Sequence, residues 1–523
     1  MKHTAPISQG KSPERHFPAG HRALESAIGR ILLVSLLVAA LSFSLDWVTE
    51  SSLASDVIRH MAARLFIPID AFVYGLDAGA ADRDRLLVVD LGNSTLDRYH
   101  TAWPLTYGQH ARMLERVRRA RPKTLFVDFQ FQSQREDASI EELLNSFCAF
   151  ASDGIPVFLA GGADAEHATL RPEFEARRGA GGQPCFRKVA VGYKADSADK
   201  NVWSYPLLSH TGAGELPSAA LALATAVRGR AIAVNPNDAQ MGVVWGSSVE
   251  SHGPMWHASV HAEPELSPSR ANAAAPTKAP VDGAKDRHYC RAPSLWDLLP
   301  LLAAVRDSRP ACPMHQSIEA ASLTMPKTPS DNDALDAMIR DRAVLYGGSF
   351  DANEFISSPL HGELPGIYLH AQAVDNLLRF GDRWRHPEIL GALGSNWERP
   401  MGFATFWVVS FILVGARHLM HRRSRRMRAM MKLLPRWAAS RSSNVRRPKV
   451  EQFVRAIVTH VKTIAGRIGL FYAMLLLAVP LSLLLEYGFR ISIIGYSSIL
   501  GFCLLGEAFT RSSEITEAVA KTR

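Results

Sequence analysis

Four apolar runs constrain the fold of this chain of 523 residues most strongly, because each is long and carries almost no charge. They cover residues 28–48, 401–416, 468–485 and 491–506. An uncharged helix of the length of 468–485 spans roughly 27 Å, close to the thickness of the hydrocarbon core of a bilayer. The sequence therefore predicts four transmembrane helices, the last two forming a tight hairpin.

Positive charge predicts how these helices cross the membrane. Residues 417–467 hold fifteen Lys and Arg against one acidic residue, so this segment is +14 and the rest of the chain sums to −5. The tail of residues 1–27 is basic as well. Because basic segments stay in the cytoplasm, we expect 1–27, 417–467 and the tail 507–523 inside, with 49–400 outside a bacterial inner membrane.

Two of these segments have a second interpretation. The run 28–48 also resembles a cleaved signal peptide, but no small-x-small cleavage site follows it directly, so we favour an uncleaved anchor. The basic segment 417–467 is also typical of nucleic-acid binding. Its apolar residues, among them Met427, Leu434 and Trp437, suit an amphipathic helix on anionic lipid instead. We expect membrane lipids as partners and no nucleic acid.

The cysteines agree with an outer location for residues 49–400. Cys148, Cys185, Cys290 and Cys312 lie there, and Cys503 lies in the last apolar run. None has the spacing of a zinc site. In an oxidising compartment two disulfides can form, and Cys290–Cys312 with Cys148–Cys185 is the favoured pairing. Four unrelated buried thiols are the alternative.

Within residues 85–400, short apolar runs alternate with helical patterns. We expect strands at 86–91, 124–129, 155–160, 241–245 and 342–346, and helices at 103–117, 140–150, 217–227 and 366–378. This alternation predicts an α/β domain with a mixed sheet covered by helices. The Ala- and Pro-rich stretch 263–285 is expected to be a flexible loop, and residues 51–80 a helical stalk.

Two carboxylates end two of the predicted strands and could face one crevice, and ligands often bind at that edge of an α/β sheet. Asp90 and Asp128 are open to several interpretations: a general acid and base, a Mg²⁺ site, turn caps, or the walls of a ligand crevice. His370 follows a Pro-Gly turn and is either a ligand contact, a pH-sensitive group or a packing residue. Trp103 begins a helix. We predict Asp90, Trp103, Asp128 and His370 as ligand-binding residues.

The sequence gives little support for catalysis or for a metal. It contains no phosphate-binding loop, dinucleotide fingerprint, G-x-S-x-G or H-E-x-x-H motif. His252, His257 and His261 have a spacing that a metal site allows, but the stretch has the composition of a loop. We therefore expect no catalytic residue, no metal and no cofactor.

Several of these stretches together carry a resemblance to a known family. They are Leu87–Asp90, Trp103-Pro104 with His110, Phe126–Phe129, Val344–Gly348 and Pro365–Ala373 with Asn376. This combination, with one span before the domain and three after it, resembles the type-2 CHASE sensor domain of bacterial cyclases and histidine kinases. The resemblance covers residues 45–505 and implies an extracytoplasmic sensor.

The resemblance implies a function without naming its output. Members usually continue into a cytoplasmic catalytic domain, whereas only a short tail follows the last apolar run here. We therefore expect the chain to detect an unknown small-molecule or protein ligand outside and to pass the signal to a separate cytoplasmic kinase or cyclase. By analogy it is a candidate homodimer. The alternatives are a structural or assembly protein of the envelope and, less favoured, an extracytoplasmic enzyme.

Overall fold

The computed structural model describes part of the chain, and it divides the chain into two compact units. The described residues are 85–133, 135–161, 170–211, 214–236, 239–247, 255–256, 311–325, 328–350 and 355–387, with parts of 29–40, 60–75 and 407–415. One unit holds Met1–Thr49, Arg399–Ala478 and Phe502–Arg523, and its described residues are helical. The other holds Glu50–Glu398 and Val479–Gly501.

Most of the residues in the predicted membrane topology lie outside the part of the chain that the structure describes. Within the part of the chain that the structure describes, no helix is both long and apolar enough to cross a membrane. The predicted spans 28–48 and 401–416 are described only in pieces. The tails 1–27 and 507–523, the loop 263–285, the basic segment 417–467 and the spans 468–485 and 491–506 lie outside the described residues.

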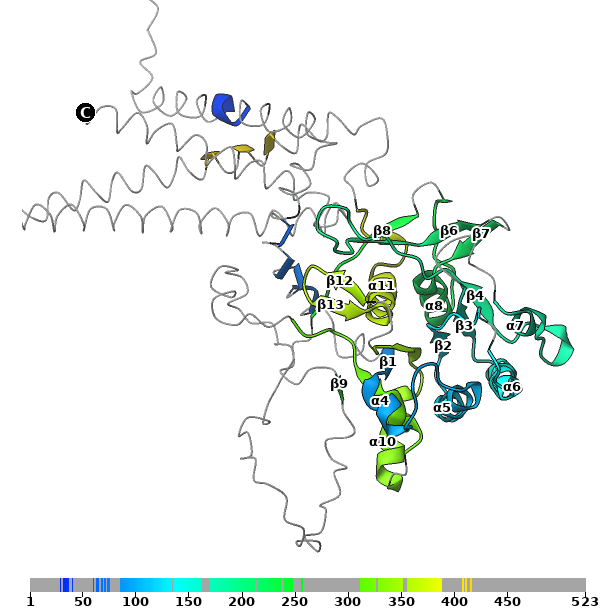
Figure 1. The fold of residues 1–523 in the computed structure, drawn as a ribbon. Coiled ribbons are helices and arrows are strands. Elements are labelled where there is room, and N and C mark those ends of the chain that lie inside the picture. The colour runs from blue at the N-terminus through cyan, green and yellow to red at the C-terminus, as the bar shows by residue number, and fades with distance from the viewer. Residues whose placement is uncertain are drawn as a thin grey trace, which may run out of the picture. The chain divides into compact units, whose positions relative to one another are not determined.

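A parallel sheet of seven strands forms the centre of the unit that contains residues 50–398 (Figure 1). Its order is β4-β3-β2-β11-β1-β10-β9. The strands are β1 (Leu86–Leu91), β2 (Thr124–Val127), β3 (Val157–Ala160), β4 (Arg187–Val189), β9 (Met255–Trp256), β10 (Ser317–Glu319) and β11 (Ala343–Gly348).

The predicted α/β domain with helices over its sheet is confirmed, but the prediction of a mixed sheet was wrong. Every pairing within the seven-stranded sheet is parallel. The physical reason lies in β1 and β11, which are buried over their whole length because helices cover both faces. Antiparallel pairs occur only beside this sheet in the described residues: β5 (Ser204–Pro206) with β8 (Gln240–Gly242), β6 (Leu208–Thr211) with β7 (Gly214–Pro217), and β12 (Phe355–Ser358) with β13 (Gly362–Pro365).

Helices lie on both faces of the sheet (Figure 1). On one face, α5 (Tyr107–Arg119) and α6 (Ile140–Ser152) pack in a core with the alternate strand residues Leu87, Val89 and Leu91. On the other face, α8 (Ala219–Arg228) and α11 (Gly366–Phe380) contact β1, β2, β3 and β11. The shorter helices are α4 (Asn93–Arg98), α7 (Pro172–Ala176) and α10 (Pro329–Ile339), with 3₁₀ turns η1 (Ala180–Gly182), η5 (Ala320–Leu323) and η6 (Gly381–Arg383).

A disulfide fastens α6 to the edge of the sheet. Cys148 in α6 is bonded to Cys185, which lies just before the edge strand β4. Cys312 is also disulfide-bonded, whereas Cys290 lies outside the described residues, so its pairing with Cys312 stays a prediction. Bonded cysteines are typical of proteins that fold in an oxidising compartment.

Helix α11 approaches the sheet closely at Gly347 of β11. A Cβ atom at this position would lie 2.9 Å from Cδ1 and 3.0 Å from Cγ1 of Ile367, in the first turn of α11. Real Cβ atoms do not approach other carbons so closely, so a side chain here would push α11 away from the sheet. Glycine at position 347 therefore sets how deeply α11 sits.

We expect Gly347→Ala to destabilise the protein by about 1 to 3 kcal/mol, because the added methyl group overpacks this contact. The measurement is denaturant unfolding of the full-length chain, followed by tryptophan fluorescence. Ile367→Ala removes Cγ1 and Cδ1, two of the three atoms in the clash, leaves Cβ at 3.0 Å, and serves as the matched partner. The double variant should be more stable than the sum of the single effects predicts, and strict additivity would contradict this account.

Candidate functional site

Asp90 lies near the carboxyl end of β1, where β1 and its neighbour β11 lead to helices on opposite faces of the sheet. After β1 the chain enters α4, which packs on the α5 side through Leu96, whereas after β11 it leads to α11 on the other side. In an α/β sheet, such a divergence creates the crevice in which ligands commonly bind. Strand register places Asp90 beside Glu319 of β10 and Gly347 of β11.

The Asp90 carboxyl group is buried and incompletely hydrogen-bonded. Its side chain accepts a hydrogen bond from Ser349, but its Oδ1 atom has no hydrogen-bond partner. Burial raises the pKa of Asp90 to about 6; the Ser349 hydrogen bond opposes this shift and the charge of Glu319 adds to it. A buried acceptor without a partner is costly, so this oxygen is suited to receive a donor from a ligand.

Glu319 brings a second carboxyl group to the same edge. It is mostly buried, and its Oε1 accepts a hydrogen bond of 3.4 Å from the hydroxyl of Thr95 in α4. The Nε atom of Arg98, also in α4, lies 4.0 Å from the same oxygen. No pattern in the sequence indicated Glu319, because strand β10 is short and its neighbour β1 lies more than 200 residues earlier in the chain.

Asp128 and His370, both predicted as ligand contacts, lie close together. The Nε2 atom of His370 is 3.8 Å from Oδ1 of Asp128, and its Nδ1 atom is 2.8 Å from the hydroxyl of Tyr205 in β5. Burial lowers the pKa of His370 to about 4, so the ring is neutral at neutral pH. The hydrogen bond to Tyr205 therefore joins α11 to β5, whereas the separation between His370 and Asp128, which follows β2, is longer than a hydrogen bond.

Trp103 lies on the other face of the sheet. Its ring packs 4.3 Å from the ring of Phe350 and 5.2 Å from that of Phe129, measured between centroids. Beside it, Nδ1 of His110 is 2.8 Å from the hydroxyl of Tyr346. Burial, and then the charge of Arg135, lower the pKa of His110 to about 3. This aromatic group belongs to the α5 core.

The four predicted ligand contacts therefore do not form one cluster in the structure. His370 lies beside Asp128, and Trp103 belongs to the opposite face. Strand β11, with Gly347, lies between the strands that lead to Asp90 and Asp128. Burial and then the charge of Asp90 raise the pKa of Tyr368, which follows Ile367 in the first turn of α11. The two carboxylates thus flank the first turn of α11.

The structure also reveals contacts between α11 and the segment before β1. We name the four residues that make them the Tyr74 clamp: Tyr74, Asp375, Asn376 and Arg379. The buried hydroxyl of Tyr74 donates to Oδ2 of Asp375 at 2.5 Å and accepts from Nδ2 of Asn376 at 2.8 Å. Arg379 donates to the Tyr74 carbonyl at 2.7 Å, and its guanidinium lies 3.7 Å from the ring centroid. The second half of α11 thereby holds this segment.

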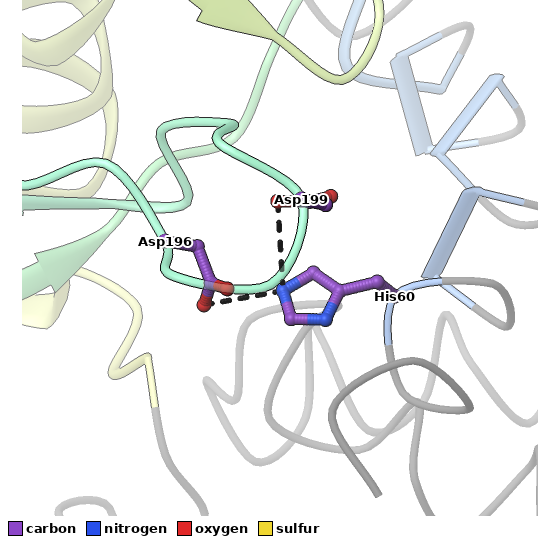
Figure 2. Close-up of side chains that lie close together, drawn as sticks. All are labelled: His60, Asp196 and Asp199. Carbon is purple, nitrogen blue, oxygen red and sulfur yellow. Dashed lines mark ion pairs between the residues drawn. The ribbon is translucent and has the colours of Figure 1, made fainter. Parts of the chain in front are cut away.

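Further contacts between ionisable side chains hold the same segment. Asp70 Oδ1 lies 3.5 Å from Nη1 of Arg385, and both side chains are buried. Burial raises the pKa of Asp70, and the guanidinium of Arg385 opposes that shift. Earlier in the segment, Nε2 of His60 lies 3.2 Å from Oδ2 of Asp196 and 3.7 Å from Oδ1 of Asp199 (Figure 2). No periodicity in the sequence connects these distant residues.

His60, Asp196 and Asp199 are also the residues of the described chain with the composition of a metal site. One nitrogen and two carboxylate oxygens lie within 4.8 Å of one another. Imidazole and carboxylate are common zinc ligands. The histidines that the sequence offered for a metal, His252, His257 and His261, lie outside the described residues.

Comparison with known proteins places this α/β domain in a class of sensory domains. The family model of the CHASE2 domain matches residues 32–416, which is more than half of the chain. The chain therefore belongs to the CHASE2 domain family, the sensory domains of signalling proteins, as the resemblance predicted. The comparisons with curated proteins and with solved structures gave no match.

We expect Asp90→Asn to change how stability depends on pH. The folded-state pKa of Asp90 is raised from 3.8 to about 6, so its contribution to stability is present below pH 4 and is lost as pH rises through 6. Relative to the parent protein, the variant should gain about 1 to 3 kcal/mol between pH 4 and pH 8. Unfolding of both proteins at the two pH values measures this.

The exposed carboxylate of Asp97, in the neighbouring helix α4, supplies the control. Asp97→Asn should leave the difference between the two pH values unchanged. If Asp90→Asn and Asp97→Asn behave alike, burial does not hold the Asp90 carboxyl group in its neutral form.

Proposed function

We propose that the chain is the sensory component of a bacterial inner-membrane signalling system. Its domain of residues 49–400 lies outside the cytoplasm, detects an envelope signal, and passes it to a separate kinase or cyclase through the membrane segments. The protein itself acts without catalysis. The proposal includes the four membrane helices and the orientation that the positive charges predict.

The observation that carries this proposal is the position of α11. Its first turn lies between Asp90 and Asp128 at the carboxyl edge of the sheet, where the Gly347–Ile367 contact fixes it. Its second half carries the Tyr74 clamp. A single helix of fifteen residues therefore contacts both the crevice and the segment that follows the first predicted membrane helix.

Rigid transmission along this path is physically reasonable. Asp375 is buried and also pairs with Arg379, whose Nε lies 3.6 Å from its Oδ2, so separating it from Tyr74 would remove one hydrogen bond from a buried carboxylate, which costs about 1 to 3 kcal/mol. The Tyr74 segment should therefore follow α11 when α11 shifts. A ligand that binds one position of α11 more tightly than another would bias the position of this segment, which is the requirement for a signal.

The chemistry at the edge of the sheet indicates what the ligand offers. Asp90 presents an acceptor without a hydrogen-bond partner, and Glu319 presents a second carboxyl group beside it. These groups favour a ligand with hydrogen-bond donors, such as hydroxyl or amino groups. The possibility that the protein acts as a homodimer stays a prediction from its layout.

We expect Tyr74→Phe to uncouple detection from output. The change removes one hydroxyl from the Tyr74 clamp, leaves Asp375 and Asn376 without that partner, and should cost about 1 to 3 kcal/mol of stability. Cells without the gene are compared with cells carrying the parent protein or the variant at equal membrane abundance. Protein phosphorylation, cyclic nucleotides and transcripts are measured under envelope stress.

The control is Tyr99→Phe, which removes an exposed hydroxyl that bonds Thr324, far from the clamp. The signalling response to envelope stress should be lost in the deletion strain. The parent protein and Tyr99→Phe should restore it, whereas Tyr74→Phe should not. If the deletion alters envelope assembly and no signalling output, the structural alternative is favoured. If Tyr74→Phe responds as the parent does, transmission through the clamp is wrong.

A further inference from the structure

The loop of residues 196–201 holds two carboxylates against a histidine from the segment before β1. Figure 2 shows one ring nitrogen of His60 facing the carboxylates of both Asp196 and Asp199. His60 is buried, whereas Asp196 retains a quarter of its side-chain exposure. We propose that His60, Asp196 and Asp199 bind a divalent transition-metal ion of the zinc type.

The spacing of the three atoms fits such an ion. Zinc lies 2.0–2.2 Å from nitrogen and oxygen ligands, so two ligands of a tetrahedral site are roughly 3.3 to 3.6 Å apart. The observed separations from Nε2 of His60 are 3.2 Å to Asp196 and 3.7 Å to Asp199. The three atoms lie within 4.8 Å of one another, so an ion beside Nε2 of His60 would draw the two carboxylate oxygens toward it.

Hydrogen bonds already orient both carboxylates, as outer-shell partners do in metal sites. Oδ1 of Asp196 accepts from the Ala198 backbone at 2.8 Å, which leaves Oδ2 facing His60. Oδ1 of Asp199, which faces His60, accepts from the Asn201 backbone at 3.0 Å and from the indole of Trp203 at 3.2 Å, and its Oδ2 accepts from the Asn201 side chain at 2.6 Å. The loop is closed by a backbone hydrogen bond of 2.9 Å between Asp196 and Asn201.

The local charge also favours a cation. Asp196 and Asp199 supply two carboxylates, and the positive group in contact with them, Arg64, reaches the other oxygen of Asp199 at 3.4 Å. More than half of the Arg64 side chain is exposed, so its ion pair contributes little and it can turn to solvent. Three protein ligands leave a coordination position for water, the arrangement of an exchangeable rather than a purely structural ion.

A bound ion would tie the segment before β1 to the loop 196–201, in addition to the attachment of this segment through the Tyr74 clamp. The ion would stabilise the arrangement in which these two parts touch, because it binds only when all three ligands meet. That consequence for signalling rests on the proposed function, whereas binding of the metal does not. The competing interpretation is an ion pair of protonated His60 with the two carboxylates.

The test is a titration of the full-length, untagged chain in detergent, stripped of metal, with Zn²⁺ followed by calorimetry. We expect about one equivalent to bind, with Asp196→Asn and His60→Asn each weakening the affinity by at least about tenfold. Asp153→Asn, an exposed carboxylate that pairs with Arg118, should bind as the parent does. Co²⁺ in place of Zn²⁺ should give visible absorption bands that both site variants lose.

The two site variants keep the test informative if one of them folds poorly, and circular dichroism of the metal-free proteins identifies such a case. Absence of saturable binding by the parent chain would overturn the proposal, as would unchanged affinity in both variants, and the three residues would then be an ion pair only. The titration and the cellular experiment with Tyr74→Phe test separate claims. Failure of metal binding would leave the proposed function untouched, and failure of the cellular experiment would leave the metal site untouched.

Discussion

The contact between Gly347 and Ile367 determines where α11 lies, and much of the rest depends on α11. A residue with a side chain on β11 would hold the helix off the sheet. Because glycine is present, residues 367–378 of α11 are all buried, the polar ones included. A helix buried on every side must find partners for each polar side chain, which ordinary amphipathic helices avoid by exposing them.

That requirement explains why the segment before β1 is part of the fold. Asp375 and Asn376 are buried, and Tyr74 supplies a hydrogen-bond partner to both. Gln372 and Asn376 also donate to the Val244 carbonyl, at 2.7 and 3.0 Å. Some of the contacts that satisfy the polar residues of α11 thus also join the helix to the segment before β1.

Local patterns in the sequence predicted the elements well. The apolar runs at 86–91 and 342–346 correspond to β1 and β11, and the Pro-Gly turn marks the start of α11. Strand direction was not predictable, because a fully apolar strand reads the same in a parallel or a mixed sheet. The predicted strand at 241–245 is shorter in the structure, where β8 ends at Gly242.

The candidate sites were harder to predict because their members are far apart in sequence. Asp90 and Asp128 were expected to face one crevice, yet neither local pattern shows that β11 is inserted between their strands. Likewise the pairs Tyr74–Asp375 and His60–Asp196 join residues that no periodicity relates. Such contacts depend on the order of strands, which is decided by packing of the whole domain.

Burial separates two kinds of polar site in this domain. At the edge of the sheet, Asp90 has a raised pKa and His370 a lowered one, because the interior disfavours their charged forms. The pKa of Asp199 moves the other way: burial raises it, but hydrogen bonds from Asn201 and Trp203 and the nearby His60 outweigh burial and lower it. Burial thus outweighs the local hydrogen bonds at the edge of the sheet, whereas in the loop 196–201 the hydrogen bonds and the neighbouring histidine outweigh burial.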